Sequence, residues 1–135
     1  MLAGLFDHIF IINLPSRPDR LRELEAQLRV IGCSLQHPSV QVFPAVRPDS
    51  QGTFPSIGAR GCFLSHLGVI KTAAERKYRR ILILEDDCNF VNVPPEHLES
   101  LASELGRRDW AFFYGGALNT VQVEPSDDRS LAELA

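Results

Sequence analysis

The sequence has few cysteines, no apolar run long enough to cross a membrane and no excess of positive charge. Its three cysteines, Cys33, Cys62 and Cys88, show no Cys-x-x-Cys spacing, so they predict free thiols in a reducing cytosol rather than a zinc or redox motif. No stretch approaches the ~20 apolar residues that a spanning helix needs. Fourteen Lys and Arg against 17 Asp and Glu give a net charge of −3, which argues against general nucleic-acid binding.

What is present is typical of one globular domain. A chain of 135 residues with 44% apolar and 23% charged residues can build a real core. We expect an α/β domain over residues 1–123 and an acidic tail over 124–135. Asp7 and His8 interrupt the apolar start and no basic region leads it, so it predicts a strand and not a signal peptide.

The chain is organised around Ile81–Leu84 and the three acids that follow, Glu85, Asp86 and Asp87. Four branched apolar residues predict a strand that is buried on both faces. Strand alternation would point Glu85 and Asp87 one way and Asp86 the other. Acids this close repel one another unless a cation is present. A hard divalent ion, alone or bridging a phosphate, would satisfy them; the alternative is solvated acids and a helix cap.

A first strand at Ile9–Leu14 leads into a helix. Leucines and isoleucine at positions 21, 24, 28 and 31 recur at helical spacing, and Gly32 ends the helix. Ser16 can cap this helix. Arg17 and Arg20 lie just past the strand end, where an anionic ligand would sit.

A second strand at Val40–Ala45 contains Pro44, which predicts an edge or a strand end. The loop over residues 47–56 is rich in Pro, Gly and Ser, and long loops of this kind are often functional. The next helix is expected from Gly58 to about Arg76, with a core stripe of Phe63, Leu67, Ile70 and Ala74. Ser65 and His66 are not a nucleophile pair, because adjacent helix positions diverge by ~100°. Taken alone, His66 is better interpreted as a half-buried, hydrogen-bonded histidine.

The last part of the chain predicts a helix around Leu98–Leu105, a core strand at Trp110–Tyr114 closed by Gly115-Gly116, and a strand at Val121–Val123. Alternating strands and helices indicate an α/β fold with a mostly parallel sheet. Polar or glycine-rich sequence follows three of the strands, at residues 13–20, 85–89 and 115–116. Right-handed crossovers could bring these strand ends to one rim.

Three stretches resemble glycosyltransferase family 25, the lipopolysaccharide-type galactosyltransferases and their collagen-modifying relatives. They are Ile11–Arg20, Gly61–His66 and Ile81–Asp87, in this order. The resemblance extends from Ile9 to about Gly116. It implies a GT-A-like (Rossmann-like) three-layer α/β/α fold, a nucleotide-sugar donor such as UDP-galactose, a saccharide acceptor such as lipopolysaccharide, and a divalent metal, usually manganese. We expect a cytoplasmic protein, with a peripheral position at the inner membrane as the alternative.

The resemblance also assigns site residues by position. Glu85-Asp86-Asp87 resembles the Asp-x-Asp signature, with Glu85 in place of the first Asp, and Asp87 is the expected metal ligand. The expected nucleotide-sugar-binding residues are Asn13, Arg17, Arg20, Ser65, His66, Glu85 and Asp86. A metal and nearby cations would stabilise the departing diphosphate. No residue is assigned as the catalytic base.

Members of this family usually continue well beyond the length of this chain, so we expect the donor-binding part, as a truncated gene product, an expressed fragment or a minimal member. The main alternative is a non-catalytic remnant that binds a nucleotide or a protein partner, including a second copy of itself. A phospho-receiver domain ranks lower, because its acids would follow the first strand. A cysteine-dependent enzyme built on Cys62 ranks lowest, since His66 is the sole base near it in sequence.

Overall fold

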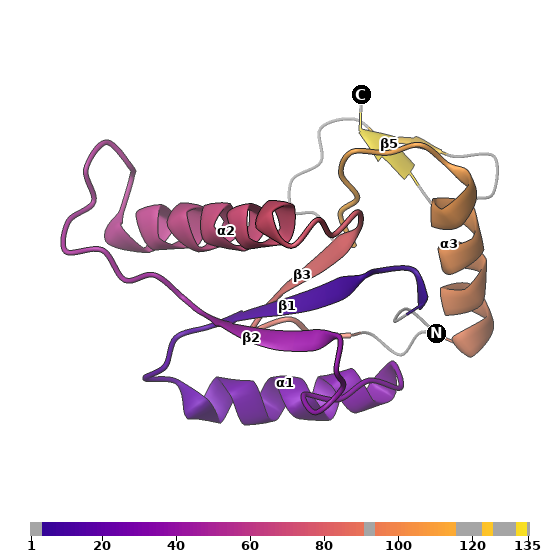
Figure 1. Cartoon of the computed structure of the whole chain (residues 1–135), viewed down its shortest axis with the longest axis horizontal. Coiled ribbons are helices and arrows are strands. Elements are labelled where there is room, and N and C mark those ends of the chain that lie inside the picture. The colour runs from indigo at the N-terminus through magenta and orange to yellow at the C-terminus, as the bar shows by residue number, and fades with distance from the viewer. Residues whose placement is uncertain (1–3, 91–93, 116–122, 126–131, 135) are drawn as a thin grey trace.

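The structure is a computed structural model that describes residues 4–90, 94–115, 123–125 and 132–134. Strands and helices alternate along most of the chain (Figure 1). The order is β1 (His8–Asn13), α1 (Pro18–Val30), β2 (Val40–Pro44), α2 (Ile57–Glu75), β3 (Ile81–Glu85), α3 (Pro95–Arg107), β4 (Val123–Pro125) and β5 (Ala132–Leu134).

The first three strands form one parallel sheet in the order β2-β1-β3. Ile11 of the central strand pairs with Val42 on one side and with Leu84 on the other. Pro44 ends the edge strand β2, as its missing N–H predicts. The expected α/β class with a mostly parallel sheet is therefore confirmed.

Strand alternation divides the core into two layers, one on each face of the sheet. Ile9 and Ile11 point to the face covered by α1, where they pack with Leu24, Leu28 and Leu84. Phe10 and Ile12 point to the opposite face and pack with Val69 and Ala73 of α2. Figure 1 shows α1 and α2 on opposite sides of the sheet. Because both faces are covered, β1 is continuously apolar until Asn13.

This strand order creates a switch point between β1 and β3. The chain leaves β1 through α1 to reach β2 on one side, then returns through α2 to β3 on the other side. In open parallel sheets, ligands bind beyond the carboxyl ends of the strands where the winding direction changes. Asn13 and the acids after β3 lie at this position, as expected.

Helix α2 buries a different stripe from the one that the sequence indicates. Its buried residues are Gly61, Ser65, Val69 and Ala73, whereas the predicted core residues Phe63 and Ile70 are 52% and 47% exposed. The prediction was wrong because it followed the bulky residues. Small residues face the sheet, and they let the helix approach it closely.

The first helix also begins differently from expectation. Arg17 is its N-cap residue, and no side chain caps it, so Ser16 does not act as the cap. Pro18 occupies the first turn, as predicted. In α2, by contrast, the Ser56 hydroxyl accepts a hydrogen bond from the Ala59 N–H.

The expected strand at Trp110–Tyr114 is wrong. These residues follow α3 without forming a strand, and Phe112 and Tyr114 are 76% and 66% exposed. The indole N–H of Trp110 instead donates to the Leu105 carbonyl near the end of α3. Gly116 and most of the expected strand at 121–123 lie outside the described residues. The strands β4 and β5 pair antiparallel within the region expected to be a tail, and the domain boundary at residue 123 stays a prediction.

Candidate functional site at the switch point of the sheet

Asn13 and Asp86 join the ends of β1 and β3. The Asn13 side-chain amide donates to Asp86 Oδ2 at 2.8 Å and to the Arg17 carbonyl at 3.0 Å. Both side chains turn toward the face covered by α1. Asn13 follows Ile9 and Ile11 in the alternation, and Asp86, in the turn after β3, contacts Asn13 and Arg20 of α1. Asn13 is buried, so its amide fixes the position of Asp86 at the rim of the sheet.

Arg20 approaches this pair from α1. Its Nη1 atom lies 3.2 Å from Asp86 Oδ1 and 3.9 Å from Asp87 Oδ2. The Asp86 side chain is only 12% exposed, whereas that of Asp87 is 65% exposed. The Asp86 carboxylate is therefore hydrogen-bonded to Asn13 and Arg20, whereas the Asp87 carboxylate is exposed to solvent.

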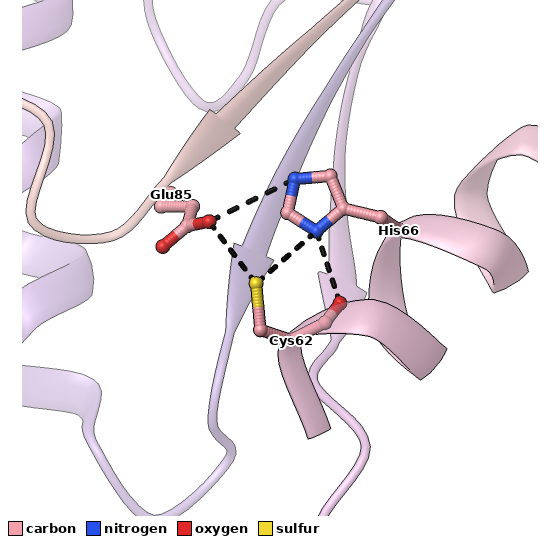
Figure 2. Close-up of side chains that lie close together, drawn as sticks. All are labelled: Cys62, His66 and Glu85. Carbon is pink, nitrogen blue, oxygen red and sulfur yellow. Dashed lines mark hydrogen bonds and ion pairs between the residues drawn. The ribbon is translucent and has the colours of Figure 1, made fainter. Parts of the chain in front are cut away.

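Glu85 points to the other face, toward α2, as strand alternation predicts. Its Oε1 atom lies 3.7 Å from His66 Nε2 and 3.6 Å from Cys62 Sγ (Figure 2). Asp87 does not share this direction, because β3 ends at Glu85 and the next residues form a turn. The prediction that Glu85 and Asp87 point the same way is therefore wrong. Glu85 contacts Cys62 and His66 of α2, and Asp87 approaches Arg20 of α1.

A cavity of about 340 Å³ lies between these strand ends, the loop after β2 and the first turns of α2. This volume is at the lower end of the range of about 300–1,000 Å³ that is typical of ligand pockets. Of the expected site residues, Arg20, Ser65, His66, Glu85 and Asp86 line it. Other lining residues were not among the expected site residues, although the loop from residue 47 and Cys62 had been considered for other roles; they include Val46, Arg47, Pro48, Gly58 and Cys62.

Two signals could have found the missed residues. The loop after β2 begins at the same sheet edge as the other strand ends, so its first residues had to lie at this rim. Cys62 precedes His66 by one helical turn, which places both on one side of α2.

Ser65 is buried and acts within the protein. Its hydroxyl donates to the Gly61 carbonyl at 2.7 Å and accepts from the Val46 N–H at 2.8 Å. It thereby attaches the loop after β2 to α2. A direct contact of Ser65 with a nucleotide sugar stays a prediction.

Arg17 lies outside the residues that line the cavity and pairs with Asp19. Two guanidinium nitrogens approach the Asp19 carboxylate at 2.7–3.1 Å. This hydrogen-bonded pair raises the pKa of Arg17 and holds the pKa of Asp19 at about 2. Both groups are exposed, and the role of Arg17 at a nucleotide stays a prediction.

Cys62 is not an activated nucleophile in this arrangement. Burial and the neighbouring Glu85 carboxylate raise the pKa of its thiol. A catalytic cysteine needs the opposite, a positive environment that lowers the pKa. Although Cys62 Sγ lies 3.7 Å from His66 Nδ1, this electrostatic environment gives no support to a cysteine-dependent enzyme.

These features define the chain as an α/β domain with a parallel sheet and a pocket at its switch point, where several polar and charged side chains meet. The sequence pattern of glycosyltransferase family 25 (LPS biosynthesis protein) matches residues 6–132. The chain therefore belongs to glycosyltransferase family 25.

Some relatives are named as inactive family members and others as galactosyltransferases. The chain is 29% identical to human "Inactive glycosyltransferase 25 family member 3" over 96% of this chain and 24% of that protein. It is 28% identical to mouse "Procollagen galactosyltransferase 2" over 89% of this chain and 22% of that protein. The chain thus spans about a quarter of the length of the curated relatives it matches. No solved structure matches it.

Within the described part of the chain, no helix combines the length and the apolar character that crossing a membrane requires.

Proposed function

We propose that this chain is the donor-binding part of a glycosyltransferase that takes a sugar, galactose in our proposal, from a nucleotide-sugar donor. The acceptor would be a saccharide such as lipopolysaccharide. In this proposal the domain is GT-A-like, and UDP-galactose is the first donor to test. A cytoplasmic location, a peripheral position at the inner membrane and self-association stay predictions.

One observation carries the proposal: the family match covers residues 6–132, and it includes every residue that lines the cavity at the switch point. The names of relatives guide the choice of substrates. A relative is named a procollagen galactosyltransferase, and the family description refers to lipopolysaccharide biosynthesis.

Arg20 is the residue best placed to contact the donor's diphosphate. It lines the cavity, and its guanidinium is held at the rim by Asp86. Guanidinium groups bind phosphate oxygens through paired N–H donors. Asn13 would act indirectly, because its amide positions the Asp86 carboxylate, which in turn holds the Arg20 guanidinium.

Asp87 fits a divalent metal better than Asp86 does. Its carboxylate is mostly exposed and, among the residues the structure describes, has only the long contact to Arg20, whereas Asp86 is occupied by Asn13 and Arg20. Oxygen ligands of this kind suit Mn²⁺ or Mg²⁺. When bound, such an ion would neutralise the charge that develops on the departing nucleoside diphosphate.

Calorimetry tests the proposal directly. Titration with UDP-galactose is expected to show binding that strengthens when Mn²⁺ is present, and Asp87→Ala is expected to remove the Mn²⁺ dependence. In a transfer or donor-hydrolysis assay, Asp87→Ala should lower metal-supported activity by at least ~100-fold. Glu99→Ala, at an exposed acid on α3, is the matched control. An unchanged rate in Asp87→Ala would remove this residue from the site.

A second candidate is a non-catalytic member that binds a nucleotide or a protein partner. Two observations favour it: relatives of similar identity are named inactive, and the three acids at the end of β3 and in the turn after it have different partners. Nucleotide binding without measurable donor hydrolysis would support this candidate. Metal-supported hydrolysis would reject it.

A further inference from the structure

Cys62, His66 and Glu85 form a compact cluster at the wall of the cavity (Figure 2). Each offers one ligand atom, and the three atoms all lie within 4.8 Å of one another. Among the described residues, this is the group of acids, histidines and cysteines that can share one ion. The acids Asp86 and Asp87 are not part of it.

The hydrogen bonding of His66 sets which ring nitrogen is free. Its Nδ1 atom lies 3.0 Å from the Cys62 carbonyl oxygen, one turn earlier in α2. A carbonyl can only accept, so Nδ1 is the donor in this contact, and Nε2 is the ring nitrogen left to coordinate an ion. Histidines that bind metals commonly use this arrangement, in which one nitrogen donates to a carbonyl and the other coordinates the ion.

The spacing of the three groups suits tetrahedral coordination. With metal–sulfur bonds of about 2.3 Å and metal–oxygen or metal–nitrogen bonds of about 2.0 Å, neighbouring ligand atoms in a tetrahedron lie about 3.3–3.5 Å apart. Glu85 Oε1 lies 3.6 Å from Cys62 Sγ and 3.7 Å from His66 Nε2. The Cys62 sulfur lies 3.7 Å from His66 Nδ1, so enclosing an ion requires the imidazole to turn Nε2 toward the sulfur.

We propose that Cys62 Sγ, His66 Nε2 and the Glu85 carboxylate form a binding site for a thiophilic divalent metal of the Zn²⁺ class. The fourth position of the ion would face the cavity and take water or an anionic oxygen of a ligand. On binding, the Cys62 thiol loses its proton to solvent, and neither the sulfur nor the metal changes oxidation state. Sulfur and nitrogen ligands select Zn²⁺ over Mn²⁺ or Mg²⁺.

Co²⁺ is the first probe, because cobalt bound to a thiolate absorbs in the near ultraviolet. Titration of the wild-type chain is expected to give one equivalent of this absorption, which Zn²⁺ then abolishes by displacement. Cys62→Ser should abolish the absorption, and His66→Ala should weaken Co²⁺ binding by at least ~100-fold. Cys33→Ser and His97→Ala are the matched controls, and both should leave the titration unchanged.

A second measurement needs no variant. Zn²⁺ is expected to slow alkylation of Cys62 by iodoacetamide at least ~10-fold in the wild-type chain, while Cys33 and Cys88 react as before. Mass spectrometry of the peptides distinguishes the three thiols. Equal alkylation of Cys62 with and without Zn²⁺, or a cobalt spectrum that persists in Cys62→Ser, would overturn the proposal.

One consequence rests on the proposed function. If Glu85 also serves the donor site, Zn²⁺ should weaken Mn²⁺-supported UDP-galactose binding in the wild type and not in Cys62→Ser. The two proposals fail separately. Absence of nucleotide binding would reject the donor site and leave the cobalt titration standing, whereas absence of a cobalt–thiolate band would reject only the Zn²⁺ site. Asp87→Ala should retain the band.

Discussion

The amide of Asn13 and the carboxylate of Asp86 meet at 2.8 Å across 73 positions of sequence. Replacing Asn13 by Ala is expected to lower the free energy of unfolding by about 1–3 kcal/mol, because Asp86 and the Arg17 carbonyl would each lose a hydrogen-bond donor. Urea denaturation measures this change. Asn89→Ala, at an exposed amide with only a 3.5 Å contact, should change the unfolding free energy by less than ~0.5 kcal/mol. Equal effects would contradict the assigned role.

Gly61 is expected to resist even the smallest side chain. A Cβ atom at this position would lie 2.6 Å from the Val46 carbonyl oxygen, whereas one at Gly58 would come no closer than 3.7 Å to any neighbour outside its own helix. Ala is normally favoured over Gly in a helix by up to ~1 kcal/mol. Gly61→Ala should nevertheless destabilise the fold by about 1–2 kcal/mol through overpacking.

Thermal unfolding of Gly58→Ala beside Gly61→Ala provides the comparison. Gly58→Ala should leave the midpoint unchanged or raise it. If Gly61→Ala raised the midpoint as well, the loop after β2 would not be packed against α2 as described.

The two arginines near the end of β1 should differ in their effect on nucleotide binding. Arg20→Ala is expected to weaken UDP-galactose binding by at least ~10-fold, because one hydrogen bond to a charged group contributes about 1.5–3 kcal/mol. Arg17 is already paired with Asp19, so Arg17→Ala should have a smaller effect. Calorimetry on both variants measures the two affinities. An equal loss of UDP-galactose affinity would indicate that Arg17 also contacts the donor.

His8 should make the fold less stable at low pH. It is buried beside Phe10 and stacks on Tyr78 at 4.8 Å, and burial lowers its pKa from the ordinary value of 6.5. Below pH 6.5 the unfolded chain binds the proton more readily than the folded one, so the free energy of unfolding decreases as the pH is lowered. One proton limits this slope to ~1.4 kcal/mol per pH unit.

Denaturation of His8→Phe between pH 5 and pH 8 (about the range in which histidine titrates) checks this assignment. The variant should lose part of the dependence on pH below 6.5, while its stability above that pH changes little. An identical pH profile in both proteins would assign the effect to other groups.

Much of the fold was predictable because hydrophobic runs and helix signals report local structure well. The apolar runs of β1 and β3, the proline in β2 and the alternation that separates Glu85 from Asp86 all follow from residue order. The buried stripe of α2 could not be predicted in this way. Gly61 and Ser65 allow the helix to approach its neighbours closely, but they add nothing to a hydrophobic pattern. Trp110–Tyr114 has high β-propensity, but propensity forms a strand only where a partner strand is available.

The sequence predicted which residues lie at the strand ends, but not which side chains contact one another there. The positions of Asn13, Arg20 and the three acids followed from the topology. The turn after Glu85 ended the alternation, so the partner of Asp87 could not be read from it. The cluster of Cys62, His66 and Glu85 depends on how closely α2 approaches β3, which the amino-acid pattern of either element does not state.

The hydrogen bond from the Val46 N–H to Ser65, together with the absence of a side chain at Gly61, ties the loop after β2 to the first turns of α2. This loop is therefore not an independent flap. A ligand that displaces this loop would either break the hydrogen bond to Ser65 or move the first turns of α2, which carry Cys62 and His66. In the second case the reactivity of the Cys62 thiol would change even for a ligand that never touches sulfur.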